Sequence, residues 1–513
     1  MSQKIFRVLF ALVIVAALVI RILPARGNNF YFTTDQGNDA VYVREILERH
    51  QLLLKGPETG IENFFAGPFW YYFIGAGYLL FNGHPFGAVF MLIILNVATV
   101  AYLMLRIAKN ISKPWAILVG AALQFFWWFY DASRYGFNPF PLVSLSILIL
   151  LFLTNAYCGK RHYFTLAAIP VALAFHTEVA GAVAFLLFYL AVALLMIAKR
   201  RINLGNLATG FIILVIFFLP FIFSEISHNF SQTEVLARQL REPSSVLNQR
   251  RFDYMTLKFK EMIGESTFAQ NTTVGTIIFA FTLIFAFYRQ KQLKKTSLFA
   301  QYFAILSTVL VIISWLWFSA TRGWQTWHTV YVQPIIFLSV LLIFSQLIYA
   351  SQKHLKIIPL LALVTILFSQ LLYFKNLYFQ FFKPFEDPSL LVNELAAVDW
   401  VYQKSAGLGF YVYTYLPSVE DYNYQYLIWW HGRNTYGYLP CEYSTFPNVP
   451  DFFVPGVKHY QQPQKPCSNL RFLIIEPDQN TLSRQTWLDQ VQKGTELDKR
   501  AKFGSIEVEA LIW

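Results

Sequence analysis

The stretch FTTDQGNDA at residues 32–40 places two carboxylates, Asp35 and Asp39, directly after the apolar run 5–23. That run has about 18 residues, which exceeds the apolar core of a cleaved signal peptide. It ends in RILPARG, which lacks the small-residue pattern of a cleavage site. We therefore predict a retained membrane span that is followed by an outer loop carrying acidic groups.

The whole chain has the composition of an integral membrane protein. Of its 513 residues, 56% are hydrophobic, 18% aromatic and 14% charged, whereas soluble domains are about a quarter charged. The mean hydropathy is +0.44. The formal net charge of +12 would suit a nucleic-acid partner, but the basic residues do not cluster on one face, which argues against that class.

Apolar runs of about 20 residues are needed to cross the hydrocarbon core of a bilayer. We find about eleven such runs, and a shorter apolar piece at 69–81 fits a helix at the membrane interface. The runs lie near residues 5–23, 86–105, 114–130, 140–156, 163–176, 179–198, 206–224, 273–288, 297–318, 328–349 and 357–375. They predict a polytopic α-helical membrane domain over residues 1–375, in which residues 24–85 form the first outer loop.

The basic residues sort to one side of these spans. Lys and Arg beside membrane spans stay cytoplasmic, so we predict a multi-pass protein of the cytoplasmic membrane with its N-terminus inside. The inner segments contain no Asp or Glu, and they hold Lys4, Arg7, Arg106, Lys109, Lys113, Lys160, Arg161, Lys199, Arg200, Arg201, Arg289, Lys291, Lys294, Lys295, Lys353 and Lys356. An odd number of spans leaves the C-terminal part outside.

Residues 376–513 are polar enough to fold in water, and they predict a small extracytoplasmic α/β domain. Its expected strands are 409–416, 470–477 and 505–513, which are rich in β-branched and aromatic residues, and its expected helices are 419–432 and 483–494. Cys441 and Cys467 both fall in this domain, where an oxidising compartment permits a disulfide between them. Cys158 is expected inside and free.

Polar side chains gather in the loops that this topology places outside. Acids, Arg and His that meet at a membrane boundary suit a phosphorylated, lipid-borne substrate, because Arg binds phosphate through charge-assisted hydrogen bonds. A carboxylate can also take the proton of an attacking hydroxyl. The candidate site residues are Asp35, Asp39, Arg134, Tyr135, Asn138, His176, Glu178, Arg322 and His328.

Several of these residues also have a purely structural interpretation. Asp35 could be the N-cap of an amphipathic helix at 37–53, because a carboxylate there accepts hydrogen bonds from free backbone N–H groups. Arg134 and Arg322 could be interfacial side chains whose stems lie along apolar surface.

Other features favour function. His176 and Glu178 lie at a depth where polar groups usually line a cavity or mark a functional site. A divalent metal held by Asp, Glu and His ligands stays an open alternative, although no specific metal-binding spacing appears.

The order of motifs resembles the GT-C superfamily of membrane glycosyltransferases. One basic-flanked span, the outer motif TTDQGNDA at 33–40 and AGPFWYYFIGAGYLLF at 66–81 resemble the bacterial family 39-like group, which is related to protein O-mannosyltransferases and the aminoarabinose transferase of lipid A. SRYGFNP at 133–139 and FHTE at 175–178 fit the same group. The resemblance covers residues 1–375 and implies a GT-C-like fold.

The resemblance also implies a chemistry. Asp35 matches the catalytic acid of the family, and it would take the proton of an acceptor hydroxyl that attacks a sugar on polyprenyl phosphate, with inversion. Cations would hold the charge on the leaving phosphate, for which Arg134 and Arg322 are the first candidates. The family often has Glu directly after the Asp, whereas this chain has Gln36, which weakens a two-acid metal site. The acceptor is a lipid, glycan or protein.

Two other classes stay open. A transporter or flippase of lipid-linked sugars would bury polar sites near the midplane, often between two related halves, and we find no internal repeat. A polysaccharide polymerase or ligase would use the same donors but place its key Arg and His in large late outer loops. The single polar face and the outer domain favour a transferase.

Overall fold

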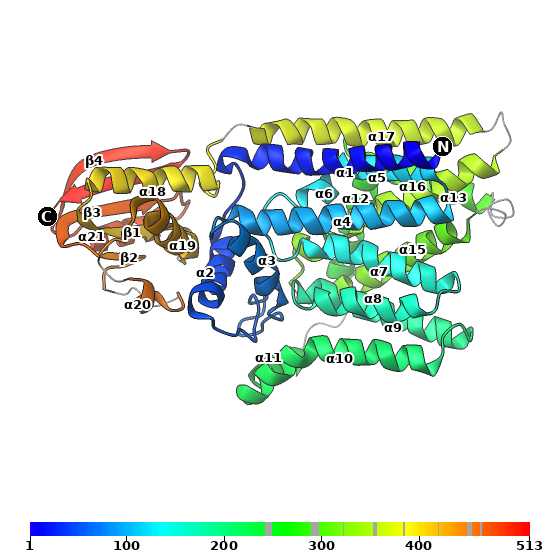
Figure 1. Cartoon of the computed structure of the whole chain (residues 1–513), viewed down its shortest axis with the longest axis horizontal. Coiled ribbons are helices and arrows are strands. Elements are labelled where there is room, and N and C mark those ends of the chain that lie inside the picture. Colours follow the sequence, from blue (N-terminus) through cyan, green and yellow to red (C-terminus); the bar gives the residue numbers. More distant parts are fainter. Residues whose placement is uncertain are drawn as a thin grey trace.

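The chain forms a bundle of long helices with a smaller sheet domain attached to one end (Figure 1). The computed structural model describes residues 1–241, 249–288, 297–321, 323–351, 356–382, 385–418, 420–448, 454–461 and 464–512. The N-terminus lies at the opposite end of the bundle from the sheet domain (Figure 1). We call the two ends of the bundle the domain end and the N-terminal end.

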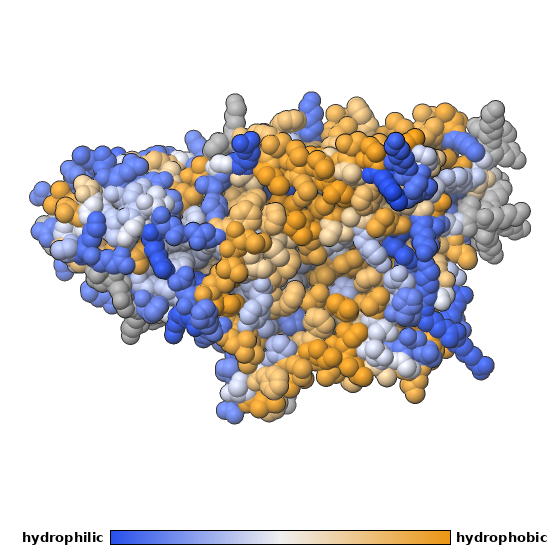
Figure 2. Space-filling model, in the orientation of Figure 1, coloured by the Kyte–Doolittle hydropathy of each residue, from blue (hydrophilic) through white to orange (hydrophobic). Residues whose placement is uncertain are grey.

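The predicted apolar runs form the helices of the bundle. Seven helical segments in the described ranges are long and apolar enough to cross a membrane; they comprise α1 (Gln3–Ala25), α4 (Phe86–Asn110), α9 (Val179–Ala198), α10 (Leu204–Ser227), α15 (Leu298–Ala320), α16 (Val332–Ala350) and α17 (Ile357–Tyr378). Figure 2 shows a hydrophobic belt over these helices, between more hydrophilic surfaces at the two ends. The chain is therefore a multi-pass membrane protein.

The other predicted runs form shorter or bent helices. Residues 114–130 break into α5 (Lys113–Gln124) and α6 (Trp127–Asp131), and the next two runs form α7 (Pro141–Tyr157) and α8 (His162–Ala174). The helices α12 (Gln249–Thr267) and α13 (Thr272–Tyr288) meet at a bend of 79°, and only together are they long and apolar enough to cross a membrane. The helix α11 (Ser231–Arg241) follows α10 at the domain end.

The first loop adds two helices at the domain end: α2 (Thr34–Arg49) and α3 (Phe69–Leu80). The prediction that Asp35 caps a helix starting at Gly37 is wrong, because α2 begins three residues earlier with Thr33 as its N-cap. The side-chain oxygen Oε1 of Gln36 accepts hydrogen bonds from the Thr33 backbone N–H at 2.9 Å and from its hydroxyl at 2.6 Å. Asp35 consequently occupies the first turn, where its charge favours the helix dipole.

The sheet domain has five strands in the order β2-β1-β3-β5-β4. Their bounds are β1 Gly409–Tyr415, β2 Glu442–Ser444, β3 Cys467–Ile475, β4 Glu496–Phe503 and β5 Ile506–Ile512. The strand β1 pairs in parallel with β2 and β3, whereas β5 is antiparallel to β3 and β4. The predicted strands and helices of this domain are confirmed, and α18 (Leu391–Ser405), β2 and β4 were not predicted.

Helices cover both faces of this sheet. One face carries Phe410, Val412 and Phe472 in the main core, which also includes buried residues of α18 and of α19 (Tyr422–His431). The other face packs against Trp487 and Val491 of α21 (Thr481–Val491). Among the residues that the structure describes, the first face shares a continuous core with the membrane helices and the second face does not.

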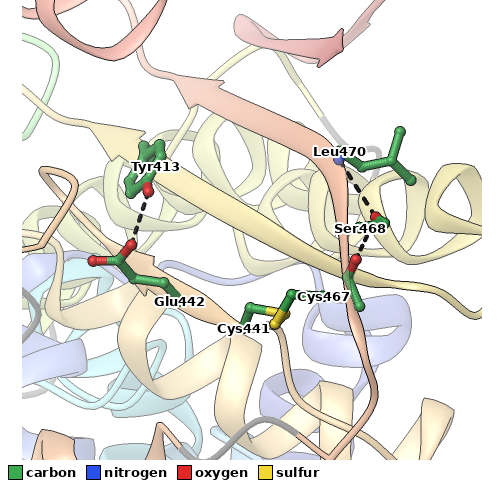
Figure 3. Close-up of a disulfide and its surroundings, with 7 residues drawn as sticks. Tyr413, Cys441, Glu442, Cys467, Ser468 and Leu470 are labelled. Carbon is green, nitrogen blue, oxygen red and sulfur yellow. Dashed lines mark hydrogen bonds between the residues drawn. A yellow bond between two sulfur atoms is a disulfide. The ribbon is translucent and has the colours of Figure 1, made fainter. Parts of the chain in front are cut away.

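A disulfide joins Cys441 to Cys467, as the sequence permitted, with the two Cα atoms 6.0 Å apart. Figure 3 shows the bond beside β1, next to the hydrogen bond that the Tyr413 hydroxyl donates to Glu442 at 2.8 Å. Cys441 directly precedes β2 and Cys467 begins β3. The disulfide therefore ties together the two strands that flank β1. Cys158 is free.

The sheet domain docks directly on the first loop. A Cβ atom added to Gly37 of α2 would lie 2.2 Å from the backbone nitrogen of Asn423 in α19, so the two helices meet with their backbones in contact. The backbone of residues 30–32 also bonds residues 389–391: Phe32 N–H donates to Ser389 O at 2.9 Å, and Leu391 N–H donates to Phe30 O at 3.0 Å. The position of α2 is thus set by the sheet domain as well as by the bundle.

This contact predicts opposite effects of alanine at two helical glycines of the first loop. Gly37→Ala should destabilise the protein by about 1–3 kcal/mol, because the methyl group has no room. Gly75→Ala in α3 is the matched control: its Cβ would meet only a Val43 methyl at 3.7 Å, and alanine favours helix by up to about 1 kcal/mol. Thermal unfolding in detergent measures both variants. Equal melting temperatures would contradict the close approach at Gly37.

Candidate active site

Asp35 is the exposed residue among the acidic sequence candidates Asp35, Asp39 and Glu178. It lies in the first turn of α2, next to Thr34, whose hydroxyl is 3.1 Å from that of Ser418, and two residues before the contact of Gly37 with Asn423. This places it at the junction between the first loop and the sheet domain. Protein surrounds the other sides of this carboxyl, and the resulting desolvation raises its pKa above the usual range. Asp35 therefore combines access to solvent with a basicity above that of an ordinary aspartate.

Asp39, one turn further along α2, is in a different environment. It is buried, and its Oδ2 accepts a 2.6 Å hydrogen bond from the indole Nε1–H of Trp70 in α3. Burial raises its pKa well above the usual range, against the effect of the Trp70 hydrogen bond, and the charge of Asp35 raises it further. The Asp39 side chain thus joins α2 to α3, one helical turn after Asp35.

Glu420 lies near Asp35, and Glu58 lies near Glu420; neither acid was among the sequence candidates. Burial raises the pKa of Glu420, and the charges of Glu58 and Asp35 add to this rise. Glu58 also contributes to the raised pKa values of Tyr42 and Tyr422, for which burial is again the main cause. Glu58 belongs to the first loop and Glu420 to the sheet domain, so both sides of the junction supply acids.

Arg134 lies on the bundle side of the junction. Its guanidinium pairs with Asp131 at 3.0 Å through Nε, lies 3.3 Å from the ring centre of Phe381 and faces the Tyr31 ring at 5.5 Å. Tyr135 packs edge-on against Tyr31 with ring centres 5.4 Å apart. Burial raises the pKa of Tyr135, and the negative charges of Asp131 and Asp35 contribute. Arg134 and Tyr135 thus reach the neighbourhood of Asp35 through Tyr31.

Glu178, His328 and Asn138 form a second group. Glu178 caps α9 by accepting a 3.1 Å hydrogen bond from the Ala180 backbone N–H, and its Oε1 lies 3.7 Å from Nε2 of His328. Burial raises the pKa of Glu178 to about 7. The Asn138 amide donates to the Thr177 carbonyl at 2.7 Å. The loops that carry these three candidates are therefore in contact, as the topology predicted.

A row of aromatic rings connects the two groups. From Tyr135 the row continues to Phe137 at 5.8 Å, to Trp327 at 6.0 Å and to His328 at 5.9 Å between ring centres. Trp327 is 38% exposed. We call Tyr31, Tyr135, Phe137 and Trp327 the aromatic row. It supplies an apolar surface between Asp35 and the pair formed by Glu178 and His328.

The other candidates have different surroundings. His176 is buried, and both ring nitrogens contact backbone: Nδ1 accepts from the Phe69 N–H at 3.4 Å, and Nε2 lies 2.9 Å from the Phe217 carbonyl oxygen. Burial lowers its pKa to about 4, so it is neutral at pH 7 and joins α3 to α10. Arg322 lies outside the described residues.

In the part of the chain that the structure describes, no group of three or more His, Cys, Asp or Glu side chains is placed to hold a metal ion. At Asp39 one carboxylate oxygen already bonds Trp70. We therefore assign no step to a metal.

No protein-family model and no curated protein sequence matches the chain. Solved structures do match its fold. ArnT from Cupriavidus metallidurans bound to undecaprenyl phosphate is 14% identical, with a TM-score of 0.56 over 99% of this chain and 98% of that chain. The apo state of the same protein gives 14% identity and a TM-score of 0.57, over 98% and 97% of the two chains.

An oligosaccharyltransferase of Archaeoglobus fulgidus, in complex with Zn and sulfate, is 11% identical and covers 94% of this chain and 70% of its own, with a TM-score of 0.44. That likeness is too loose to carry an argument. The likeness to ArnT extends over nearly the full length of both chains, sheet domain included. This chain therefore has the fold of ArnT, in agreement with the GT-C-like fold expected from the sequence.

Proposed function

We propose that the chain transfers a sugar from a polyprenyl-phosphate donor to an acceptor hydroxyl at the domain end, with Asp35 as the base. The observation that carries this proposal is the exposed carboxylate of Asp35, with its raised pKa, at the junction of the bundle and the sheet domain. A base must reach the hydroxyl that it deprotonates, and it works best when its pKa approaches the working pH. Asp39 and Glu178 are too buried to meet the first condition.

The donor side of the proposal rests on the aromatic row and on the neighbouring structure. ArnT of Cupriavidus metallidurans binds undecaprenyl phosphate, which supports a polyprenyl-phosphate partner here. Trp327 and its neighbours offer apolar and aromatic surface for the lipid and the sugar ring. Arg134 uses Nε for Asp131, and within the described residues its two Nη groups are free to hold a phosphate oxygen. Arg322 stays a second candidate for that task.

The reaction then needs no general acid. The acceptor oxygen bonds to the anomeric carbon while the bond from that carbon to the phosphate oxygen breaks, and the bonding electrons leave with the phosphate. The hydroxyl proton passes to the Asp35 carboxylate. Attack from the face opposite the phosphate inverts the anomeric centre. Because phosphate is a weak base, its stabilisation calls for fixed positive charge, and Arg134 supplies that charge.

Location follows from the same proposal. Basic residues beside membrane spans stay cytoplasmic, and the basic loops 106–113, 158–161 and 199–203 all belong to the N-terminal end of the bundle. We therefore place the N-terminal end on the cytoplasmic side of the cell membrane. The domain end, which carries the disulfide, then lies on the outer side.

The first expected outcome concerns Asp35→Asn. Loss of the base should lower transfer about 10²- to 10⁴-fold, because the amide cannot accept the proton. The measurement is transfer of radiolabelled sugar from a panel of polyprenyl-phosphate sugars to acceptors in native membrane extract. Glu420→Gln is the matched control, because it removes a neighbouring acid without removing the base, and it should cost less than about tenfold. Equal activity of Asp35→Asn and wild type would exclude Asp35 as the base.

The pH profile gives a second test. Protonated Asp35 cannot act as a base, so kcat/KM should fall as the pH drops through its folded pKa, and the midpoint should lie above the ordinary aspartate value of about 3.9. The acid limb of the profile should fit the titration of a single proton. In Asp35→Asn the residual rate should be flat over the same range. A midpoint at or below 3.9 would refute the raised pKa.

Asp39 predicts a pH effect on stability. Burial raises the pKa of Asp39 in the folded state. The stability that the protonated carboxyl contributes is therefore fully present below the unfolded pKa of about 3.9, and it is lost as the pH rises through the folded pKa. Asp39→Asn keeps an acceptor for Trp70 and cannot ionise. The variant should match wild type near pH 4 and become the more stable protein as the pH rises. The measurement is the melting temperature of both proteins from pH 4 to 8. If the variant instead became less stable than wild type as the pH rises, Asp39 would be ionised in the folded protein.

A further inference from the structure

A cavity of about 700 Å³ opens at the N-terminal end of the bundle, far from Asp35. It lies between the last residues of α4 and α7, the turn after α9 and the first turn of α15, and its polar lining includes Asn110, Tyr157, Arg161, Arg201 and Ser297. We propose that this cavity binds the phosphate-bearing headgroup of an anionic lipid. This site is separate from the proposed transfer reaction and does not depend on it.

Arg201 is held in place inside the cavity. Its Nη1 donates to the Tyr157 carbonyl at 3.1 Å and contacts the Tyr302 hydroxyl at 3.3 Å. Its guanidinium also lies 5.7 Å from the ring centres of both tyrosines. Among the described residues, Nε and Nη2 have no partner, and a guanidinium offers such groups to two oxygens of one phosphate. Arg201 is therefore an ordered cation whose remaining donors are free for an anion.

Two further elements add positive potential to the same cavity. Arg161, at the start of α8, lines it with an exposed side chain. The 23-residue helix α15 begins at its wall: Ser297 is the N-cap, and Leu298 and Phe299 of the first turn are lining residues. The N-terminus of a helix carries partial positive charge and free N–H donors. The three cationic elements come from different parts of the sequence, and they meet at one place.

The surroundings of the cavity contain no opposing charge in the sequence. The segments 106–113, 157–162 and 199–205, which border the cavity, hold eight Lys and Arg residues and no Asp or Glu. Figure 2 shows strongly hydrophilic residues over this end of the bundle, next to the hydrophobic belt. The potential in the cavity is therefore positive, which selects an anion.

The size and depth of the cavity favour a lipid headgroup over a small ion. Ligand pockets of about 300–1,000 Å³ hold drug-sized molecules, which are much larger than a bare phosphate ion. The walls come from the ends of membrane-spanning helices, where headgroups lie, and Tyr302, Leu298 and Phe299 add apolar surface. An anionic phospholipid would place its phosphate on Arg201 and its glycerol against these side chains.

The cavity cannot serve the chemistry at Asp35. It borders Asn110 at one end of α4, and the first-loop helices α2 and α3 lie at the other end of that helix. The 25 residues of α4 extend over about 37 Å at 1.5 Å per residue. A phosphate in the cavity is thus on the opposite side of the membrane from the candidate active site.

The test uses the full-length protein in an uncharged detergent and measures its melting temperature against added lipid. Phosphatidylglycerol should raise the melting temperature in a saturable way and should be retained in native mass spectra, whereas phosphatidylcholine should not. The double variant Arg161→Gln/Arg201→Gln should weaken the apparent affinity at least tenfold. The matched control Lys160→Gln/Lys199→Gln removes the same charge from the same end without altering the lining of the cavity, and it should stay within twofold of wild type.

Arg161→Gln alone changes an exposed side chain, so it tests the site even if loss of Arg201 disturbs folding, and it should weaken binding about threefold or more. Equal losses in the two double variants would overturn the site in favour of general surface attraction. Protection by phosphatidylcholine would overturn the requirement for an anion. Soluble glycerol phosphate that protects without lipid would overturn the lipid as the occupant.

Discussion

The backbone contact between α2 and α19 at Gly37 determines where the candidate active site is. Because the two helices touch there, the first loop is fixed to the sheet domain, and Asp35 lies two residues before this contact. The hydrogen bond between Asp39 and Trp70 then fixes α2 to α3 on its other side. Asp35 is consequently an exposed residue on a helix that is held on two sides, which is the condition for accurate placement of the proposed base.

A second constraint acts inside the bundle, where broken helices need polar partners because hydrocarbon supplies none. The short helix α6 follows such a break, and the Asn96 amide donates to the carbonyl of Phe129 within α6 at 3.0 Å. Arg21 of α1 bonds the same region through Ser133, Gln124 and Asn96 at 2.6–3.0 Å. This buried network holds the turn that presents Arg134 and Tyr135. Its residues lie in four segments of the sequence, and the network therefore appears only in the folded chain.

The membrane part of the fold could be predicted because a helix that crosses a bilayer must be long and apolar. The disulfide could be predicted as a pairing because two cysteines fall in one outer domain. The start of α2 could not be predicted in this way, because several residues near it are typical of a helix start: Thr33, Asp35 and Gln36. Only the hydrogen bonds between Gln36 and Thr33 show where the helix begins. The strand β4 was missed because its solvated residues, from Glu496 to Phe503, have no apolar alternation. Glu58 and Glu420 were missed because the junction that unites them is tertiary.

The three acids that the sequence analysis selected for the site all have a raised pKa, and their surroundings separate their roles. Burial is the main cause at Asp35, Asp39 and Glu178, so basicity alone does not choose between them. Asp39 bonds Trp70, and Glu178 bonds the first turn of α9 beside His328; each of these two holds parts of the structure together. Asp35 is exposed, and a substrate hydroxyl can reach it. Burial thus raises the pKa of all three acids, but two of them hold the structure together, and only the exposed position of Asp35 is compatible with the proposed role as a base.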